Sequence, residues 1–312
     1  MRIVFMGTPE FAVRSLEALV CSGHELVGVV TQPDKPVGRK REIMKTPVKV
    51  YAESRGIPVY QPRRIRDEEA IAQISEWAPD LIVTAAYGQI LPVALLNLPS
   101  LGAINVHASL LPKYRGAAPI NRAIIDGETE TGITIMYMTE EMDAGDMILQ
   151  RAVEIGDQTT AGELTERLSV LGAELLLEAV SLLISGQAEA VKQDESLVTL
   201  APMLKREDEL VDFARTSAEL VNQIRGLSPA PSAYTYLDGR VFKLLAATAV
   251  TGDAGLEPGT ISEIDKERLV IATGSGGLSL LEVQAAGKRP MTIAQFLQGA
   301  RLKKGDRFGE NV

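Results

Sequence analysis

Short apolar runs alternate with amphipathic segments along the first two-thirds of the chain. Residues 2–7, 25–31, 80–88, 102–108 and 131–139 have the pattern of buried strands, and residues 10–22, 68–78 and 119–126 that of intervening helices. This alternation is typical of a parallel sheet flanked by helices. We therefore predict an α/β fold whose N-terminal part is a doubly wound, mainly parallel sheet of the Rossmann-like type.

Leucines at helical spacing from Thr159 to about Ser185 predict a long amphipathic helix. Thr160 and Glu163 are spaced as a capping box at its start. After it the chain becomes polar and loses its periodicity, as expected of a connection between domains. We predict a catalytic domain at residues 1–188, a linker at 189–205 and a second domain at 206–312.

The last third has a different pattern, in which a helix-like segment at residues 216–227 is followed by short strand-like runs with few helices. Asp238-Gly239 between two such runs indicates a hairpin turn. Short strands in near succession predict a small β-barrel, of the OB-like type, for the C-terminal domain.

Composition adds a globular character, with 46% hydrophobic and 23% charged residues. The N-terminus has no signal-peptide pattern, and charges interrupt the other apolar stretches, so we expect a cytoplasmic protein with no membrane partner. The single cysteine excludes an internal disulfide and a multi-thiolate metal site.

The net charge of −9 disfavours attraction of nucleic acid to the whole surface, but two segments are locally basic. Residues 33–45 carry five basic side chains against two acidic ones. A second cluster near the C-terminus consists of Lys288, Arg289, Arg301, Lys303, Lys304 and Arg307. On charge alone, a solvated surface is the preferred interpretation of both segments.

The strand-like run at 102–108 carries two polar residues near its end that could take part in catalysis. Residues two apart on a strand share a face, so Asn105 and His107 project together near the strand end where open sheets carry active sites. A catalytic histidine usually takes its orientation from a carboxylate, and the spacing leaves both Asp143 and Asp146 open. The pattern contains no serine or cysteine nucleophile and no metal-ligand spacing. It favours direct acyl transfer, with the Asn and a protonated His holding the oxyanion while the Asp supports the imidazolium.

"INVHASLLPKYRGAAPI" together with "DAGDMI" resembles the formyltransferase family that uses 10-formyltetrahydrofolate. The resemblance implies that Asn105, His107 and Asp143 are the catalytic residues. It also implies that this folate is the formyl donor, that no metal is needed, and that the folate-binding segment consists of Ser109, Leu110, Leu111 and Pro112.

Within that family, "FMGTPEFA", "TQPDKPVGR" and "SPAPSAYT" are most similar to members that formylate the initiator methionyl-tRNA for translation initiation. The resemblance implies that the loop at 33–45 enters the tRNA acceptor end, with Arg39 as its best-matched contact. It favours tRNA contacts for the two basic segments, and we expect a monomer. The residues predicted to bind tRNA are Arg39, Lys40, Arg41, Lys45, Lys303 and Lys304.

Two other functions remain as alternatives. The same catalytic residues could formylate a small amine, such as a purine-precursor ribonucleotide or an amino sugar nucleotide. Alternatively, the chain could be a non-catalytic tRNA-binding protein. The basic loop and the extra C-terminal domain favour tRNA over the small amines as formyl acceptor.

Overall fold

The computed structural model describes residues 1–37, 42–251 and 255–309, in which the chain forms two compact units. The first unit comprises Met1–Pro119, Glu130–Val153 and Thr165–Pro202. The second comprises Ile120–Thr129, Glu154–Leu164 and Met203–Val312. Each unit therefore draws on separate stretches of the chain.

A seven-stranded sheet forms the first unit, in the order β10-β9-β7-β6-β1-β2-β5. Its strands are β1 (Arg2–Gly7), β2 (Glu25–Val30), β5 (Val59–Tyr60), β6 (Leu81–Ala85), β7 (Ala103–His107), β9 (Glu130–Tyr137) and β10 (Met147–Glu154). Pairing is parallel from β5 through β2, β1 and β6 to β7, whereas β7 and β9 are antiparallel. The predicted mainly parallel sheet is confirmed.

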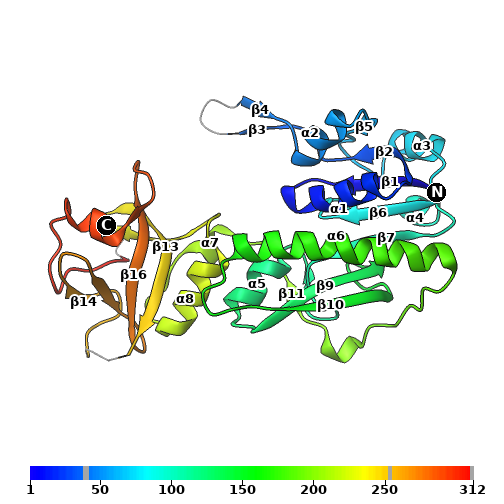
Figure 1. Ribbon diagram of the computed structural model, residues 1–312. Coiled ribbons are helices and arrows are strands. Elements are labelled where there is room, and N and C mark those ends of the chain that lie inside the picture. The colour runs from blue at the N-terminus through cyan, green and yellow to red at the C-terminus, as the bar shows by residue number, and fades with distance from the viewer. Residues whose placement is uncertain (38–41, 252–254, 310–312) are drawn as a thin grey trace. The chain divides into compact units, whose positions relative to one another are not determined.

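Helices follow the strands as the alternation predicts (Figure 1). They are α1 (Glu10–Cys21), α2 (Pro47–Ser54), α3 (Glu68–Glu76), α4 (Val93–Leu96) and α6 (Ala161–Ser185). The central strands β1, β6 and β7 carry fully buried side chains such as Phe5, Ile82 and Ile104. Such all-round burial explains why these strands are continuous apolar runs.

Helix α6 is the long helix that the leucine spacing predicts. Thr160 and Glu163 form the predicted capping box, since each main-chain N–H donates to the other's side chain. By length and composition α6 could cross a membrane, so the prediction that charges interrupt every such stretch is wrong here. Half of its apolar window is buried, and a Cβ added at Gly172 would lie 2.9 Å from Val106. The helix therefore packs closely on β7.

A hairpin of β3 (Lys35–Val37) and β4 (Glu42–Met44) extends away from the sheet (Figure 1). A polar cluster anchors the base of this hairpin. Lys49 Nζ lies 2.6 Å from both Asp34 Oδ2 and Gln61 Oε1. The hydrogen bond from Lys49 holds the pKa of Asp34 below its usual value. The start of the hairpin is thus joined to α2, which follows it.

Residues 189–202, most of the predicted linker, belong to the first unit. In this segment a 3-10 turn at Glu195–Leu197 is followed by β11 (Leu200–Ala201), which pairs in parallel with β8 (Arg115–Gly116). Hydrogen bonds to main-chain groups elsewhere in the first unit help to hold this segment in place, such as the one from Arg115 N–H to Thr199 O.

An antiparallel sheet forms the second unit, in the order β12-β13-β16-β15-β14 with β17 beside β16. Its strands are β12 (Ala233–Leu237), β13 (Arg240–Val250), β14 (Ile261–Ile264), β15 (Leu269–Ala272), β16 (Gly277–Ala285) and β17 (Met291–Thr292). The predicted turn at Asp238-Gly239 joins β12 to β13, with φ of +50° and +68°.

The chain after helix α9 (Ile293–Leu297) links the two edges of this sheet. Ile261 in β14 exchanges main-chain hydrogen bonds with Gly305 and Asp306, and Gly309 N–H donates to the carbonyl of Tyr236 in β12. The last described residues thus bridge the edge strands, which gives the sheet a barrel-like arrangement. A bridged edge has fewer unpaired main-chain groups to offer to other chains.

Four helices complete the second unit: α5 (Pro119–Ile125), α7 (Arg206–Glu209), α8 (Ser217–Gly226) and α9 (Ile293–Leu297). Arg122 of α5 pairs with Asp208 of α7, at 2.8 Å from Nη2 to Oδ2. Asn121 Nδ2 donates to the carbonyl of Gly226 at 2.7 Å. These contacts explain why residues 120–129 pack with the second unit.

A buried threonine organises the loop after β7. Thr134 is fully buried on β9, and its hydroxyl donates to Ser109 O at 2.7 Å. The same oxygen accepts from Leu111 N at 3.1 Å and from Gln150 Nε2 at 2.9 Å. One hydroxyl therefore satisfies three groups around residues 109–111.

We expect Asp208→Asn to destabilise the second unit at pH 7 by about 1–3 kcal/mol, because a charge-assisted hydrogen bond is lost. The hydrogen bond from Arg122 lowers the pKa of Asp208. Its contribution is therefore present above the unfolded pKa, about 4, and is lost as the pH falls through the lowered value. Urea unfolding at pH 7 and in acid measures both effects. Glu207→Gln, at an exposed neighbouring position, is the control, and equal stability of the two variants would contradict the prediction.

Thr134→Val should destabilise the first unit by about 2–4 kcal/mol, because it leaves buried polar groups without their partner. Thr134→Ser keeps the hydroxyl and should lose about 1 kcal/mol, the contribution of one buried methyl group. Denaturant midpoints of the three proteins give the comparison. Similar losses in the two variants would show that the hydroxyl is not the important group.

Candidate active site

Asn105 and His107 lie on β7, with His107 as the last residue of the strand. Asn105 pairs with Thr84 of the parallel neighbour β6, and Thr84 Oγ1 lies 2.7 Å from Asn105 Oδ1. A hydroxyl that donates to Oδ1 fixes the plane of the amide and leaves its NH₂ group available as a donor.

His107 is only 5% exposed, and each ring nitrogen faces a different partner. Nε2 lies 3.0 Å from the carbonyl oxygen of Tyr114. Because a carbonyl can only accept, this contact requires a proton on Nε2. Nδ1 lies 3.6 Å from Asp143 Oδ1. Nδ1 is therefore the ring nitrogen that faces the carboxylate.

Asp143 follows β9 in a loop that adopts a left-handed backbone conformation, with φ of +54°. Its Oδ2 accepts from the main-chain N–H of Gly116 at 2.8 Å. Of the two aspartates that the spacing left open, Asp143 is the one whose carboxylate lies beside His107. The structure thus brings together His107, at the end of β7, and Asp143, in the loop after β9.

The loop that carries Asp143 rests on a residue that sequence reasoning missed. Gln193 Nε2 donates to the carbonyl oxygens of both Asp143 and Gly145, each at 2.8 Å. Gln193 lies inside the predicted linker, where a polar residue gives no signal of burial. In the folded chain Gln193 is 9% exposed, so its burial becomes evident only from the structure.

The four residues predicted to bind folate form the turn that follows β7. Ser109 and Leu111 are buried, whereas Leu110 and Pro112 are partly exposed. The Ser109 hydroxyl donates to the carbonyl of Lys113 at 2.7 Å, so it stabilises the turn itself. The partly exposed members are the ones placed to offer a surface to a ligand.

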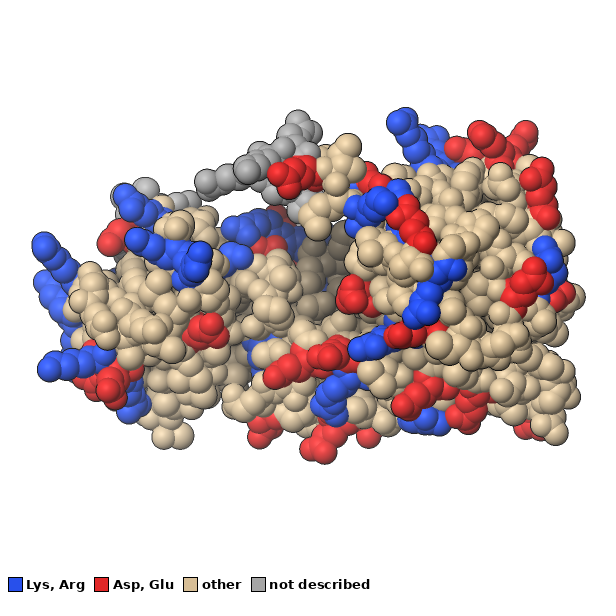
Figure 2. Space-filling view, turned by 45° about the horizontal axis from the view of Figure 1, so that its top comes forward, with Lys and Arg blue, Asp and Glu red and all other residues tan. Residues whose placement is uncertain are grey.

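The predicted tRNA contacts fall in three places. Lys45 is exposed at the base of the β3–β4 hairpin, and its Nζ lies 2.6 Å from Glu53 Oε2. Lys303 and Lys304 are exposed on the second unit, where Lys and Arg side chains gather in Figure 2. Arg39, Lys40 and Arg41 lie outside the described residues.

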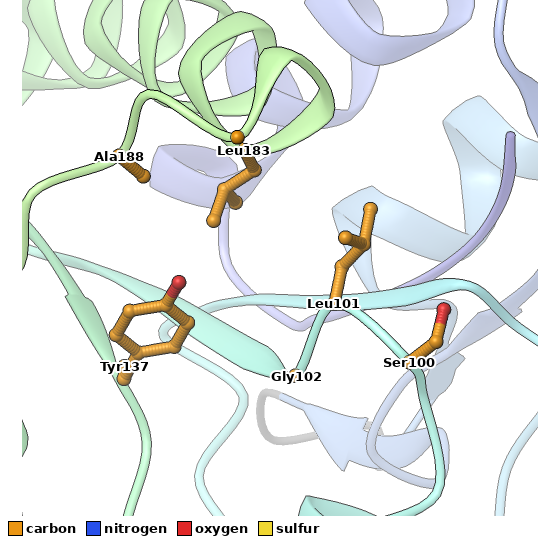
Figure 3. Close-up of a pocket in the computed structure, with 7 residues that line it drawn as sticks. Ser100, Leu101, Gly102, Tyr137, Leu183 and Ala188 are labelled. Carbon is orange, nitrogen blue, oxygen red and sulfur yellow. The ribbon is translucent and has the colours of Figure 1, made fainter.

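An open hollow of about 370 Å³ lies at the other end of β7, before the strand begins (Figure 3). The residues that line it are Ser100, Leu101, Gly102, Tyr137, Leu183, Gly186 and Ala188. None of the predicted catalytic or folate-binding residues is among them.

Comparison with known proteins gives the family. The formyl transferase family model matches residues 1–180, and the model of the formyl transferase C-terminal domain matches residues 203–301. A relative from Geobacter sulfurreducens, named methionyl-tRNA formyltransferase, is 49% identical and covers 99% of this chain and 97% of its own length. A relative of the same name from Bacillus mycoides is 50% identical over the whole of both chains.

Solved structures agree at the level of the fold. A sugar 3N-formyl transferase shares 19% identity with a TM-score of 0.68, covering 93% of this chain and 99% of its own. The N-formyltransferase of Helicobacter canadensis shares 21% identity with a TM-score of 0.66, covering 91% and 98%. With both family models matched in chain order and relatives similar over the full length, the chain belongs to the formyltransferase family.

Proposed function

We propose that this protein transfers a formyl group from 10-formyltetrahydrofolate to the α-amino group of methionyl-tRNA. The product would be N-formylmethionyl-tRNA for translation initiation. The observation that carries the proposal is the similarity of 49–50% over the full length of relatives named for this activity. Both units are covered, so the similarity extends beyond the catalytic residues.

Neither alternative is as well supported. The two sugar-formylating structures share only 19–21% identity with this chain, so they support a common fold and leave the acceptor open. A non-catalytic tRNA-binding protein would have no need of a buried histidine beside a carboxylate at a strand end. We therefore favour an enzyme that acts on tRNA.

The reaction would begin with the neutral α-amine of methionyl-tRNA, whose reference pKa of about 8 leaves a usable unprotonated fraction at pH 7. Its lone pair attacks the formyl carbon on N10 of the folate, and the carbonyl electrons move to the formyl oxygen. Collapse of this tetrahedral intermediate releases tetrahydrofolate. The proton lost by the amine balances the one gained by N10.

The geometry suggests how the side chains divide this work. His107 Nε2 is engaged with Tyr114, so Nδ1 would be the nitrogen that serves the reaction. Nδ1–H would donate to the developing oxyanion, and the Asp143 carboxylate beside it would help to hold the ring in place. The NH₂ group of Asn105, whose Oδ1 is held by Thr84, would be the second oxyanion donor.

The formyl donor would lie against the turn at residues 109–112, where Leu110 and Pro112 are partly exposed. The turn begins two residues after His107, so a ligand bound there lies near the catalytic side chains. Choice of the initiator tRNA, a monomeric state and a cytoplasmic location remain predictions.

His107→Ala should lower kcat by about 10²–10⁴-fold, the usual contribution of a positioned acid or base. Folding and the KM for the folate should change little, because the turn at 109–112 is held by Thr134. The assay follows labelled formyl groups from 10-formyltetrahydrofolate to charged methionyl-tRNA, and then to small amines. His24→Ala, which changes the chain's other histidine, is the matched control. Normal turnover by His107→Ala would rule out its assigned role.

Replacing both Lys303 and Lys304 by Ala should weaken tRNA binding and reduce its dependence on salt. Each lost phosphate contact lowers the slope of log K against log salt by about 0.7–0.9. Turnover at saturating tRNA should stay close to that of the parent chain. Lys266→Ala, at an exposed position in the same unit, is the control. A salt slope that does not change would remove these lysines from the interface.

A further inference from the structure

We propose that Gln193, oriented by Arg115, is a positioning residue that sets the Asp143 carboxylate against His107. This inference rests on the proposed function, because it assumes that Asp143 acts with His107 in formyl transfer. It assigns a catalytic purpose to the segment that the sequence presents as a linker.

The contacts of Gln193 converge on the loop that carries Asp143. Both bonds from Nε2 end on main-chain carbonyls of that loop, one on each side of Ala144. The loop has little room to shift, since a Cβ added at Gly145 would lie 1.8 Å from Tyr137 O. Gln193 therefore braces a tightly fitted loop whose Asp143 holds an unfavourable left-handed conformation.

Arg115 determines which way the Gln193 amide points. The Nε and Nη2 atoms of Arg115 lie 3.0 and 2.8 Å from Gln193 Oε1. A guanidinium can only donate, so the oxygen of the amide must face Arg115 and its NH₂ must face the loop. Arg115 is 7% exposed, and a planar buried donor of this kind holds its acceptor in one geometry.

The same arginine is linked to the carboxylate through its main chain. Gly116, the next residue, donates the N–H that Asp143 Oδ2 accepts. Arg115 N–H in turn donates to Thr199 O at 2.9 Å, which ties the strand β8 to the 189–202 segment. The carboxylate of Asp143 is thus located from both sides, by Gly116 at its oxygen and by Gln193 at its own main chain.

The charge of Arg115 is balanced from the solvent side by Glu195, at 2.8 Å from Nη2 to Oε1. The hydrogen bond from Arg115 lowers the pKa of Glu195. The Glu195 side chain is 71% exposed, and among the described residues its hydrogen bonds go to Arg115 and not to the Asp143 loop. It therefore offers a control that touches the same arginine without reaching the loop.

The test is a double-mutant cycle on kcat for formyl transfer. Gln193→Met keeps the shape of the side chain and removes its hydrogen bonds, and we expect kcat to fall by about 10–100-fold. The KM for the folate should change by less than about 2-fold. In an Asp143→Asn background the same change should cause almost no further loss, because Gln193 would act through that carboxylate. Glu195→Gln should stay within about 2-fold of the parent chain.

Two outcomes would overturn the inference. An unchanged kcat in Gln193→Met would show that the loop is placed without it. An equal loss in both backgrounds would show that Gln193 only anchors the segment at 189–202. If Gln193→Met does not fold, Arg115→Lys takes its place in the cycle, since lysine cannot donate the two bonds that orient the glutamine.

A measurement on the histidine rings, which does not depend on turnover, distinguishes a failure of this inference from a failure of the proposed function. The chain has two histidines, so ring-labelled protein gives one signal for His107 and one for His24. Gln193→Met should move the His107 signal and leave the His24 signal in place. If the parent chain formylates no tRNA, the proposed function is wrong, and this shift still decides the positioning role. A His107 signal that stays in place overturns it.

Discussion

The bond between His107 Nε2 and the carbonyl of Tyr114 is the constraint on which the candidate site depends. It fixes the ring plane and the protonated nitrogen, and it directs Nδ1 toward Asp143. The bond can form only because the chain turns back within seven residues of the strand end. The site is therefore as rigid as the turn between His107 and Tyr114.

Supports for that turn come from parts of the chain that are far apart in sequence. Thr134 holds its start from β9, and Thr199 binds the main-chain N–H groups of Tyr114 and Arg115 at its end. The catalytic candidates span only 38 positions, from Asn105 to Asp143. The groups that hold them come from as far along the chain as Thr199, close to the last residue of the first unit. Precision at the site is thus a property of the whole unit.

The elements that the sequence predicts well are those with a local cause. Buried strands, the capping box of Thr160 and Glu163, and the Asp238-Gly239 turn each follow from a few neighbouring residues, and all three are found. The placement of the loop that carries Asp143 and the role of residues 189–202 have no local cause. Gln193 binds main-chain carbonyls and Arg115 binds the Gln193 side chain, and such contacts leave no trace in composition or periodicity. The separate pieces of the second unit, such as residues 120–129, also escape prediction, because pairs like Arg122 and Asp208 form across long stretches of chain.

The choice of acceptor must lie outside the catalytic residues. Sugar-formylating enzymes share the fold of this chain at only 19–21% identity, so the fold leaves the acceptor open. An acidic chain of net charge −9 repels a polyanion over most of its surface, so binding tRNA requires local basic segments. The base of the β3–β4 hairpin is anchored by Lys49 and Asp34, and Lys303 and Lys304 belong to the second unit. Under the proposed function, selection of the tRNA would then fall to these basic segments, which are separate along the chain from the candidate catalytic residues.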